Sequence, residues 1–122
     1  MELIDTHNHM YFEEFDADRD EVYARAQAAG IKQMLHIGID LKTSEKVLAL
    51  AQQHNFIYAT AGIHPHDAGD IAVDDIDKIA EMLEHPRMVG IGEIGLDFFR
   101  NLTPPDAQEK VLLQFLGIYK RL

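Results

Sequence analysis

The sequence contains no cysteine, and its hydrophobic runs are short. Without cysteine there is no disulfide and no thiolate nucleophile, which excludes thiol enzymes and is compatible with the cytoplasm. No run approaches the roughly 20 apolar residues of a membrane span. The first residues, Met-Glu-Leu-Ile-Asp, lack the basic region and the apolar stretch of a signal peptide. We therefore expect a cytoplasmic protein without a membrane partner.

Basic residues are also scarce. Eleven lysines and arginines face 21 acidic residues, which gives a net charge of −10. Proteins that coat nucleic acid with a broad basic surface are usually positively charged, so this class is disfavoured. A bound metal ion supplies local positive charge, so the acidity does not exclude phosphate chemistry at a metal centre. The GxSxG motif and the glycine-rich P-loop are absent, which excludes the usual serine hydrolases and P-loop kinases.

The 122 residues, 47% of them hydrophobic, suffice for one domain, residues 1–122, with one core. Apolar periodicity and turn residues indicate strands and helices in strict alternation. The expected strands are at about residues 2–8, 31–37, 56–61 and 88–93. The expected helices are at about residues 16–29, 43–55, 74–84 and 104–122.

Helix starts are indicated by residues that cap helices well. Asp16 is a candidate N-cap for the first helix, and Thr43 or Ser44 for the second. Thr103 followed by Pro104 predicts the start of the last helix, with threonine as cap and proline at the first helical position. The apolar stripe of this last helix comprises Val111, Phe115, Ile118 and Leu122.

Four strand-then-helix units predict an α/β fold with parallel strands and right-handed crossovers. A complete (β/α)8 barrel takes about 250 residues, so this chain is close to a (β/α)4 half of a TIM-type barrel, with helices flanking a parallel sheet. The alternative is a small open doubly wound sheet. Against it, the glycine-rich dinucleotide-binding turn is missing after the first strand, where His7-Asn8-His9 stands instead.

His7 and His9 are the most informative residues of the chain. Side chains at positions i and i+2 of a strand point to the same face, so the two imidazoles project side by side. Two imidazoles at the end of a strand can hold one divalent metal, which indicates metal-assisted hydrolysis. The other interpretation is a pair of solvated or packed histidines without a ligand.

Glu93 is the strongest partner for this pair. It follows an apolar strand, and in parallel α/β sheets active sites form at the carboxyl ends of the strands. A carboxylate has two oxygens and can bridge two cations. Glycines at 90, 92 and 95 allow other groups to approach the backbone closely. The alternative is a glutamate that caps a loop or pairs with a lysine.

Weaker signals indicate roles for three further residues, His64, Arg100 and His36. His64 follows the third strand and is predicted to contact the substrate or to support a ligand, although metal binding or a plain loop histidine is an alternative. Arg100 follows Glu93 and can bind a phosphate through its forked guanidinium, or else form a surface salt bridge. His36, between two aliphatic residues, is expected to be a packed histidine.

Three motifs, in this order, carry a resemblance to a known family: residues 4–9 (Ile-Asp-Thr-His-Asn-His), residues 62–66 (Gly-Ile-His-Pro-His) and residues 92–97 (Gly-Glu-Ile-Gly-Leu-Asp). Together they resemble TatD-family metal-dependent hydrolases of the amidohydrolase-like superfamily. The resemblance extends over essentially the whole chain.

The resemblance implies a (β/α)8 barrel that hydrolyses phosphodiester bonds in DNA with two divalent metal ions, without distinguishing Mg, Mn or Zn. His7 and His9 match the ligands of the first metal, and Glu93 matches the bridging carboxylate of the catalytic site. His64 matches a motif histidine. The family's further ligands, two histidines and an aspartate, come from later strands that residues 1–122 do not supply.

Two hypotheses therefore remain open. The first is the N-terminal half of a TatD-type deoxyribonuclease with an incomplete site and DNA as substrate. The second is an inactive half-barrel that acts as an association module, because the open edges of its sheet can pair with a second copy or with a complementing C-terminal half. Hydrolysis of an amide or a lactone by related chemistry is a weaker third hypothesis.

Overall fold

The computed structural model describes residues 1–121. The elements follow one another along the chain as β1 (Leu3–Asn8), the short 3-10 helix η1 (Glu13–Phe15), α1 (Arg19–Ala28), β2 (Ile31–Ile37), α2 (Leu41–Gln53), β3 (Ile57–Ala61), α3 (Asp75–Met82), β4 (Met88–Ile91) and α4 (Pro105–Tyr119). Leu122, predicted on the apolar stripe of the last helix, lies outside the described residues. Within residues 1–121, no helix combines the length and the apolar character needed to cross a membrane.

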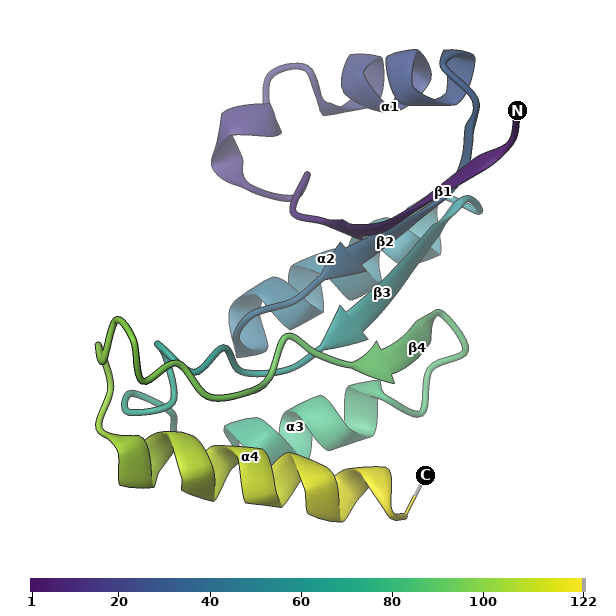
Figure 1. Ribbon diagram of the computed structural model, residues 1–122. Helices are drawn as coiled ribbons and strands as arrows, with labels where there is room; N and C mark the ends of the chain where they lie inside the picture. Colours follow the sequence, from purple (N-terminus) through teal and green to yellow (C-terminus); the bar gives the residue numbers. More distant parts are fainter. Residues whose placement is uncertain (122) are drawn as a thin grey trace.

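The four strands form one parallel sheet in the order β1-β2-β3-β4. Figure 1 shows all four arrows pointing the same way, with α2 behind β2 and β3 and with α3 and α4 lying together beside β4. Each strand is followed by a helix before the next parallel strand, as the alternating pattern predicts. The carboxyl ends of the strands therefore meet at one end of the molecule.

The helices cover only one face of the sheet. Met34 and Ala59 on that face are 1% and 0% exposed, whereas Ile4 and Val89 are 60% and 55% exposed. Parallel sheets are normally covered on both faces, and a doubly wound fold would place helices on both. One-sided burial is what half of a closed barrel shows, because the second face would line the barrel interior.

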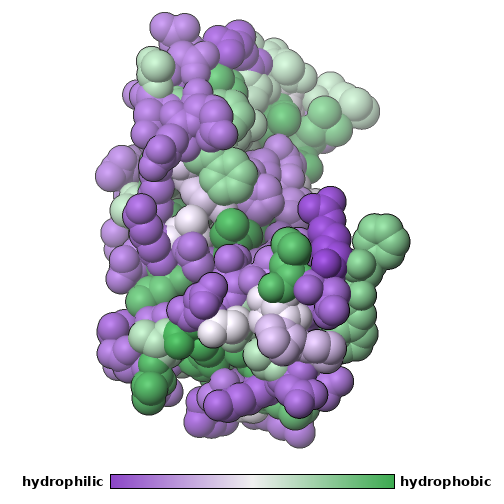
Figure 2. All heavy atoms as spheres, turned by 90° about the vertical axis from the view of Figure 1, so that its left-hand side faces the viewer, coloured by the Kyte–Doolittle hydropathy of each residue, from purple (hydrophilic) through white to green (hydrophobic). Residues whose placement is uncertain are grey.

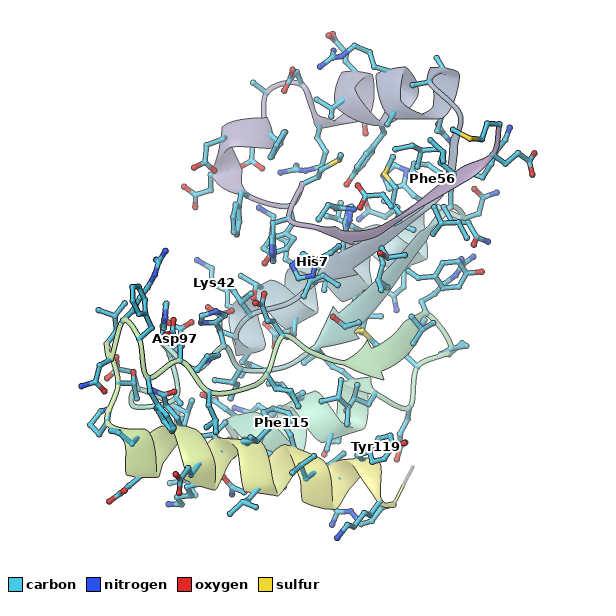
Figure 3. All side chains as sticks on the ribbon, viewed as in Figure 1. His7, Lys42, Phe56, Asp97, Phe115 and Tyr119 are labelled. Atoms are coloured by element: carbon cyan, nitrogen blue, oxygen red, sulfur yellow. The ribbon has the colours of Figure 1, made fainter. Side chains whose placement is uncertain are left out.

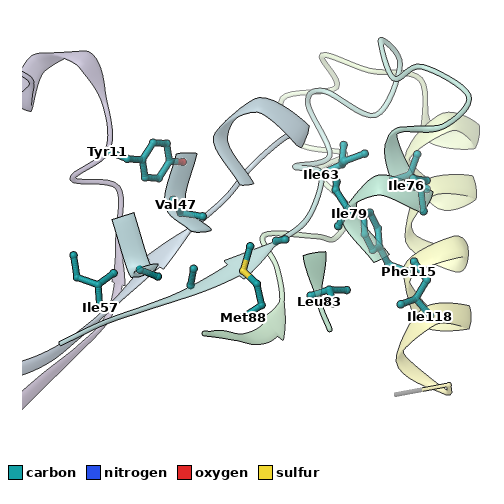
Figure 4. Close-up of a cluster of buried hydrophobic side chains, with 14 of the residues drawn as sticks. Tyr11, Val47, Ile57, Ile63, Ile76, Ile79, Leu83, Met88, Phe115 and Ile118 are labelled. Carbon is teal, nitrogen blue, oxygen red and sulfur yellow. The ribbon is translucent and has the colours of Figure 1, made fainter. Parts of the chain in front are cut away.

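The hydrophobic core lies between the covered face and the helices. Val47 of α2, Ile57 of β3 and Ile79 of α3 are completely buried. Phe115 extends this cluster into α4, where the apolar stripe predicted from the sequence faces inward (Figure 4). This packing fixes the strands, and with them the loops that leave their carboxyl ends.

The structure corrects the start of the first helix. Helix α1 begins at Arg19, with Asp18 rather than Asp16 as its N-cap. The Asp16 carboxylate instead forms an ion pair with Arg19 and lies 3.5 Å from Lys46 Nζ of α2. Its ion pairs with the nearby Arg19 and the distant Lys46 thus replace the capping role.

The starts of α2 and α4 also differ from the prediction. Asp40 caps α2: its carboxylate accepts a hydrogen bond of 2.6 Å from the backbone N–H of Thr43, which is the third residue of the helix rather than its cap. Ser44 is fully buried within α2. At α4, Pro104 is the N-cap, and the hydroxyl of Thr103 donates to the carbonyl of His66 instead.

Candidate metal centre

His7 is the penultimate residue of β1, where Figure 3 labels it, and His9 directly follows the strand. The Nε2 atoms of the two rings are 3.2 Å apart, and the rings meet edge to face. Two lone pairs at this distance repel each other unless a proton or a cation lies between them. The pair therefore has the geometry of two ligands that converge on one ion.

The ring of His9 is held in the tautomer that a ligand needs. Its Nδ1 lies 3.1 Å from the carbonyl oxygen of Ile37 and 3.0 Å from the Tyr11 hydroxyl, which itself donates to Ile37. Nδ1 therefore carries the proton, and Nε2 offers its lone pair to the site. Burial and the charge of nearby His7 lower the pKa of His9, which favours this neutral form.

The tyrosine behind His9 is a stable donor. Tyr11 is 1% exposed, and burial raises its pKa to about 12. Tyr11 therefore keeps its phenolic proton at any ordinary pH and donates it in a hydrogen bond to the carbonyl of Ile37. On its other side the His9 ring stacks on Phe12 at a centroid distance of 5.2 Å, so the ligand is packed on a rigid aromatic support.

Glu93 reaches the pair because the chain crosses the end of the sheet after β4. The N–H of Gly92 still bonds the carbonyl of Ala61 on β3, but the N–H of Glu93 donates to Gly38, which follows β2, at 2.8 Å. The Gly92–Glu93 peptide bond is cis. β4 accordingly ends at Ile91, two residues earlier than the sequence predicts.

This crossing brings Glu93 to the histidines. Its Oε2 lies 3.7 Å from Nε2 of His7 and 3.9 Å from Nε2 of His9. One ligand atom from each of the three side chains lies within 4.8 Å of the others, which is a spacing that a single divalent ion can bridge. Two imidazoles and a carboxylate suit zinc and other divalent transition metals.

Gly62 makes this approach possible. A Cβ atom at residue 62 would lie only 2.8 Å from the carbonyl oxygen of Glu93 and 2.9 Å from the side chain of Ile94. Only glycine leaves room for the Glu93 backbone at this point. The glycine that opens the second motif thus positions the glutamate of the third.

His64 faces the opposite side of the carboxylate. Its Nε2 lies 3.6 Å from Oε1 of Glu93, while His7 and His9 face Oε2. Its backbone N–H donates to the carbonyl of Ile39 at 2.7 Å, which ties the loop after β3 to the loop after β2. The structure thus brings His64 to the cluster without adding it to the three-residue ligand group.

His66 points away from the cluster toward the loop that leads into α4. Its Nε2 lies 2.6 Å from Oδ2 of Asp97, and the other carboxylate oxygen accepts the backbone N–H groups of Phe99 and Arg100 (Figure 3). The Arg100 N–H and the His66 ring hold the pKa of Asp97 below its usual value. The Arg100 side chain is exposed on this loop, outside the ligand group.

Gln108 is the residue of this region that the sequence analysis missed. It is 1% exposed; its Oε1 accepts the N–H of Asp97, and its Nε2 donates to the carbonyl of Thr103, both at 2.7 Å. The signal was available, because Gln108 stands three residues before Val111 on the buried stripe of α4. A buried polar side chain on such a stripe must satisfy buried partners.

Figure 2 looks onto this end of the sheet, where hydrophilic side chains cover most of the surface and hydrophobic groups lie between them. His36 does not contribute to the site. It is a fully buried residue of β2, with Nε2 2.7 Å from the hydroxyl of Tyr23 on α1, as expected for a packed histidine.

Comparison with known proteins identifies the family. The sequence model of a family described as TatD related DNase matches residues 4–122. The chain belongs to the TatD-related DNase family. Among its TatD-family relatives, a Bacillus subtilis (strain 168) protein described as the uncharacterized metal-dependent hydrolase YabD is 35% identical over 120 residues. The 3'-5' ssDNA/RNA exonuclease TatD of Enterobacter lignolyticus (strain SCF1) is 47% identical over 96 residues.

The chain spans about half the length of the TatD-family proteins it matches. The YabD match includes 98% of this chain but 47% of YabD, and the Enterobacter match includes 79% of this chain and 37% of that protein. The crystal structure of YJJV, a TatD homolog from Escherichia coli K12, superposes with a TM-score of 0.89 and 30% identity over 98% of this chain and 47% of that one. The fold is therefore the half of a TIM-type barrel that the sequence predicts.

Proposed function

We propose that this chain contributes half of the active site of a TatD-type hydrolase that cleaves phosphodiester bonds in DNA. The observation that carries the proposal is the convergence of His7, His9 and Glu93 from β1 and β4, with His9 held in the ligand tautomer. Relatives described as single-stranded DNA and RNA exonucleases support a nucleic-acid substrate. The hypothesis of an inactive association module is not favoured, because the ligand group is intact.

In this proposal His7, His9 and Glu93 would hold a divalent metal ion, and Glu93 would also contribute to the second metal of a complete site. A divalent ion at such a site supplies Lewis-acid activation of water and neutralises negative charge at phosphorus. His9 stays neutral and oriented through Ile37. Arg100 binds the substrate, since its guanidinium offers N–H donors to anionic oxygens near this end of the sheet, and His64 supports the Glu93 carboxylate, whose Oε1 lies 3.6 Å from its Nε2.

The proposal includes a partner that completes the barrel: a second copy of the chain or a complementing C-terminal half. The edge of β4 borders an apolar groove of about 470 Å³ between the strand and α4. Val89 and Tyr119 in this groove are 55% and 70% exposed. Such an uncovered strand edge favours strand pairing with another polypeptide. The cytoplasmic location stays a prediction from composition.

The test is hydrolysis of a 3'-labelled single-stranded DNA by the chain with Mg²⁺, Mn²⁺ or Zn²⁺, compared between wild type, Glu93→Gln and the surface control Glu84→Gln. We expect slow, metal-dependent release of nucleotides that Glu93→Gln reduces at least about 100-fold and Glu84→Gln leaves unchanged. Hydrolysis that survives Glu93→Gln would contradict the assignment. Zinc affinity measured by calorimetry provides a second readout that does not need turnover.

A further inference from the structure

The chain contains two His-Pro-Xaa turns with the same internal hydrogen bond. In the first, the N–H of His66 donates to Nδ1 of His64 at 3.1 Å across Pro65. In the second, far from the metal centre, the N–H of Arg87 donates to Nδ1 of His85 at the same distance. Proline fixes the backbone φ of the middle residue, which holds this geometry in place. The turn is therefore a property of the local sequence and recurs where no ligand group is present.

This hydrogen bond has a chemical consequence for the ring. A nitrogen that accepts a hydrogen bond carries a lone pair, so in the neutral imidazole the proton must lie on the other nitrogen, Nε2. At His64, Nε2 is the atom that faces Oε1 of Glu93 at 3.6 Å. His9 shows the opposite arrangement, with its proton on Nδ1 and its lone pair on Nε2. On one side of the Glu93 carboxylate, His64 therefore presents an N–H donor. On the other side, His9 presents a lone pair.

We propose that the turn at residues 64–66 holds His64 in the Nε2–H tautomer, so that it directs an N–H group, and not a lone pair, at Oε1 of Glu93, positions that carboxylate and is not a metal ligand through Nε2. The inference deepens the proposed function and rests on it only for the role of Glu93 as a ligand. With the His64 N–H directed at Oε1 from 3.6 Å, Oε2 is left to face the pair of His7 and His9. His64 is a positioning residue in this scheme.

The anchoring of the turn supports a fixed rather than a fluctuating ring. The His66 side chain is hydrogen-bonded to the carboxylate of Asp97. The backbone carbonyl of His66 accepts a hydrogen bond from the hydroxyl of Thr103, which is 4% exposed. The backbone N–H of His64 is bonded to Ile39, and Pro65 is buried. A change of tautomer at His64 would leave the N–H of His66 without its acceptor, which is unfavourable in a partly buried turn.

The tautomer is directly measurable by two-bond ¹H–¹⁵N spectra of the histidine side chains, recorded at about pH 8.5, above the ordinary histidine pKa. We expect His64 to show a pyrrole-type Nε2 and a pyridine-type Nδ1, and His9 to show the reverse. Each signal is assigned by its loss in a histidine-to-glutamine variant. An Nδ1–H tautomer at His64 would overturn the proposal.

Titration with Zn²⁺ separates this proposal from the proposed function. We expect zinc to shift the ring nitrogens of His7 and His9 while His64 keeps its Nε2 proton. Loss of that proton on zinc addition would make His64 a ligand and overturn the inference. If zinc moves none of the signals, the metal assignment fails, and the tautomer of His64 is still read from the metal-free spectrum.

Matched variants test the positioning role. Pro65→Gly should give His64 a mixture of tautomers, whereas Pro86→Gly should affect only His85. His64→Leu should lower the zinc affinity about 10-fold, in line with partners that orient a ligand, and His64→Gln, which keeps an N–H donor at the ε position, should retain most of it. Equal zinc affinities for the leucine and glutamine variants would show that the donor does not position Glu93.

Discussion

The hydroxyl of Tyr23 on α1 lies 2.7 Å from Nε2 of His36 on β2, and both side chains are almost completely buried. This contact joins the first helix to the sheet with a single polar bond inside an apolar layer. Burial lowers the pKa of His36 to about 4, and the neighbouring carboxylate of Asp5 only partly offsets this effect. The histidine is therefore neutral in the folded protein at physiological pH.

This buried histidine predicts an acid-sensitive stability. Between pH 6.5 and about 4 the unfolded chain binds a proton at His36 that the folded chain does not bind. The free energy of unfolding therefore has its full value above pH 6.5 and falls as the pH drops through this window. The loss should be on the order of 3 kcal/mol. Urea unfolding across this range should show a shallower decline for His36→Gln than for wild type, and an unchanged decline for His85→Gln. Equal slopes for wild type and His36→Gln would contradict the assignment.

Gly62→Ala should damage both the fold and the metal centre. Its new Cβ would press on the Glu93 carbonyl from 2.8 Å, so we expect a loss of about 1 to 3 kcal/mol in the free energy of unfolding and a weaker affinity for zinc. Gly117→Ala is the matched control, since a Cβ there meets no atom within 4 Å and lies in the interior of α4. That control should stabilise the protein by up to about 1 kcal/mol and leave zinc binding unchanged.

Gln108→Leu tests the buried amide under the loop at Asp97. The substitution removes the acceptor for the N–H of Asp97 and the donor for the carbonyl of Thr103. Two unsatisfied buried groups should cost roughly 2 to 4 kcal/mol, measured by urea unfolding. Gln114→Leu, exposed on the same helix, should change the stability by less than about 0.5 kcal/mol. Similar losses in both variants would assign the effect to helix α4 in general.

Self-association predicts a response to charge at the open edge of the sheet. If two copies pair along their strand edges, sedimentation velocity should show a dimer for wild type and a monomer for Val89→Lys, because a lysine on an edge strand disfavours pairing. Val73→Lys, at a fully exposed loop position, should behave as wild type. A wild-type chain that stays monomeric at high concentration would leave only a complementing half as partner.

The parallel direction of the strands and the ligand pair were predictable because they depend on local patterns. The i, i+2 spacing of His7 and His9 at the end of β1 predicts that the two side chains share a face, and the repeated strand–helix pattern predicts parallel strands. The capping residues were less predictable. Asp16 and Asp40 are equally good caps by type, yet Asp40 caps α2 while Asp16 pairs with Arg19 three residues on and with Lys46 of α2.

The supporting parts of the site depend on contacts between distant segments. No sequence pattern shows that Glu93 will cross the sheet end to bond Gly38, or that Gly62 will make room for it. Because of that crossing, Oε2 of Glu93 faces His7 and His9, while Oε1 faces His64. The sequence therefore predicts which residues are candidate ligands, whereas the distances and contacts between them depend on the fold.

The three candidate ligands come from the two outermost strands, with His7 on β1, His9 directly after it and Glu93 just after β4. An ion held there would crosslink the two borders of the sheet and close a loop that contains most of the chain. Closing so long a loop removes much of the conformational entropy of the unfolded chain, in the manner of a disulfide that this cysteine-free sequence cannot form. Metal binding would then stabilise the folded half-barrel, and removal of the metal would destabilise it.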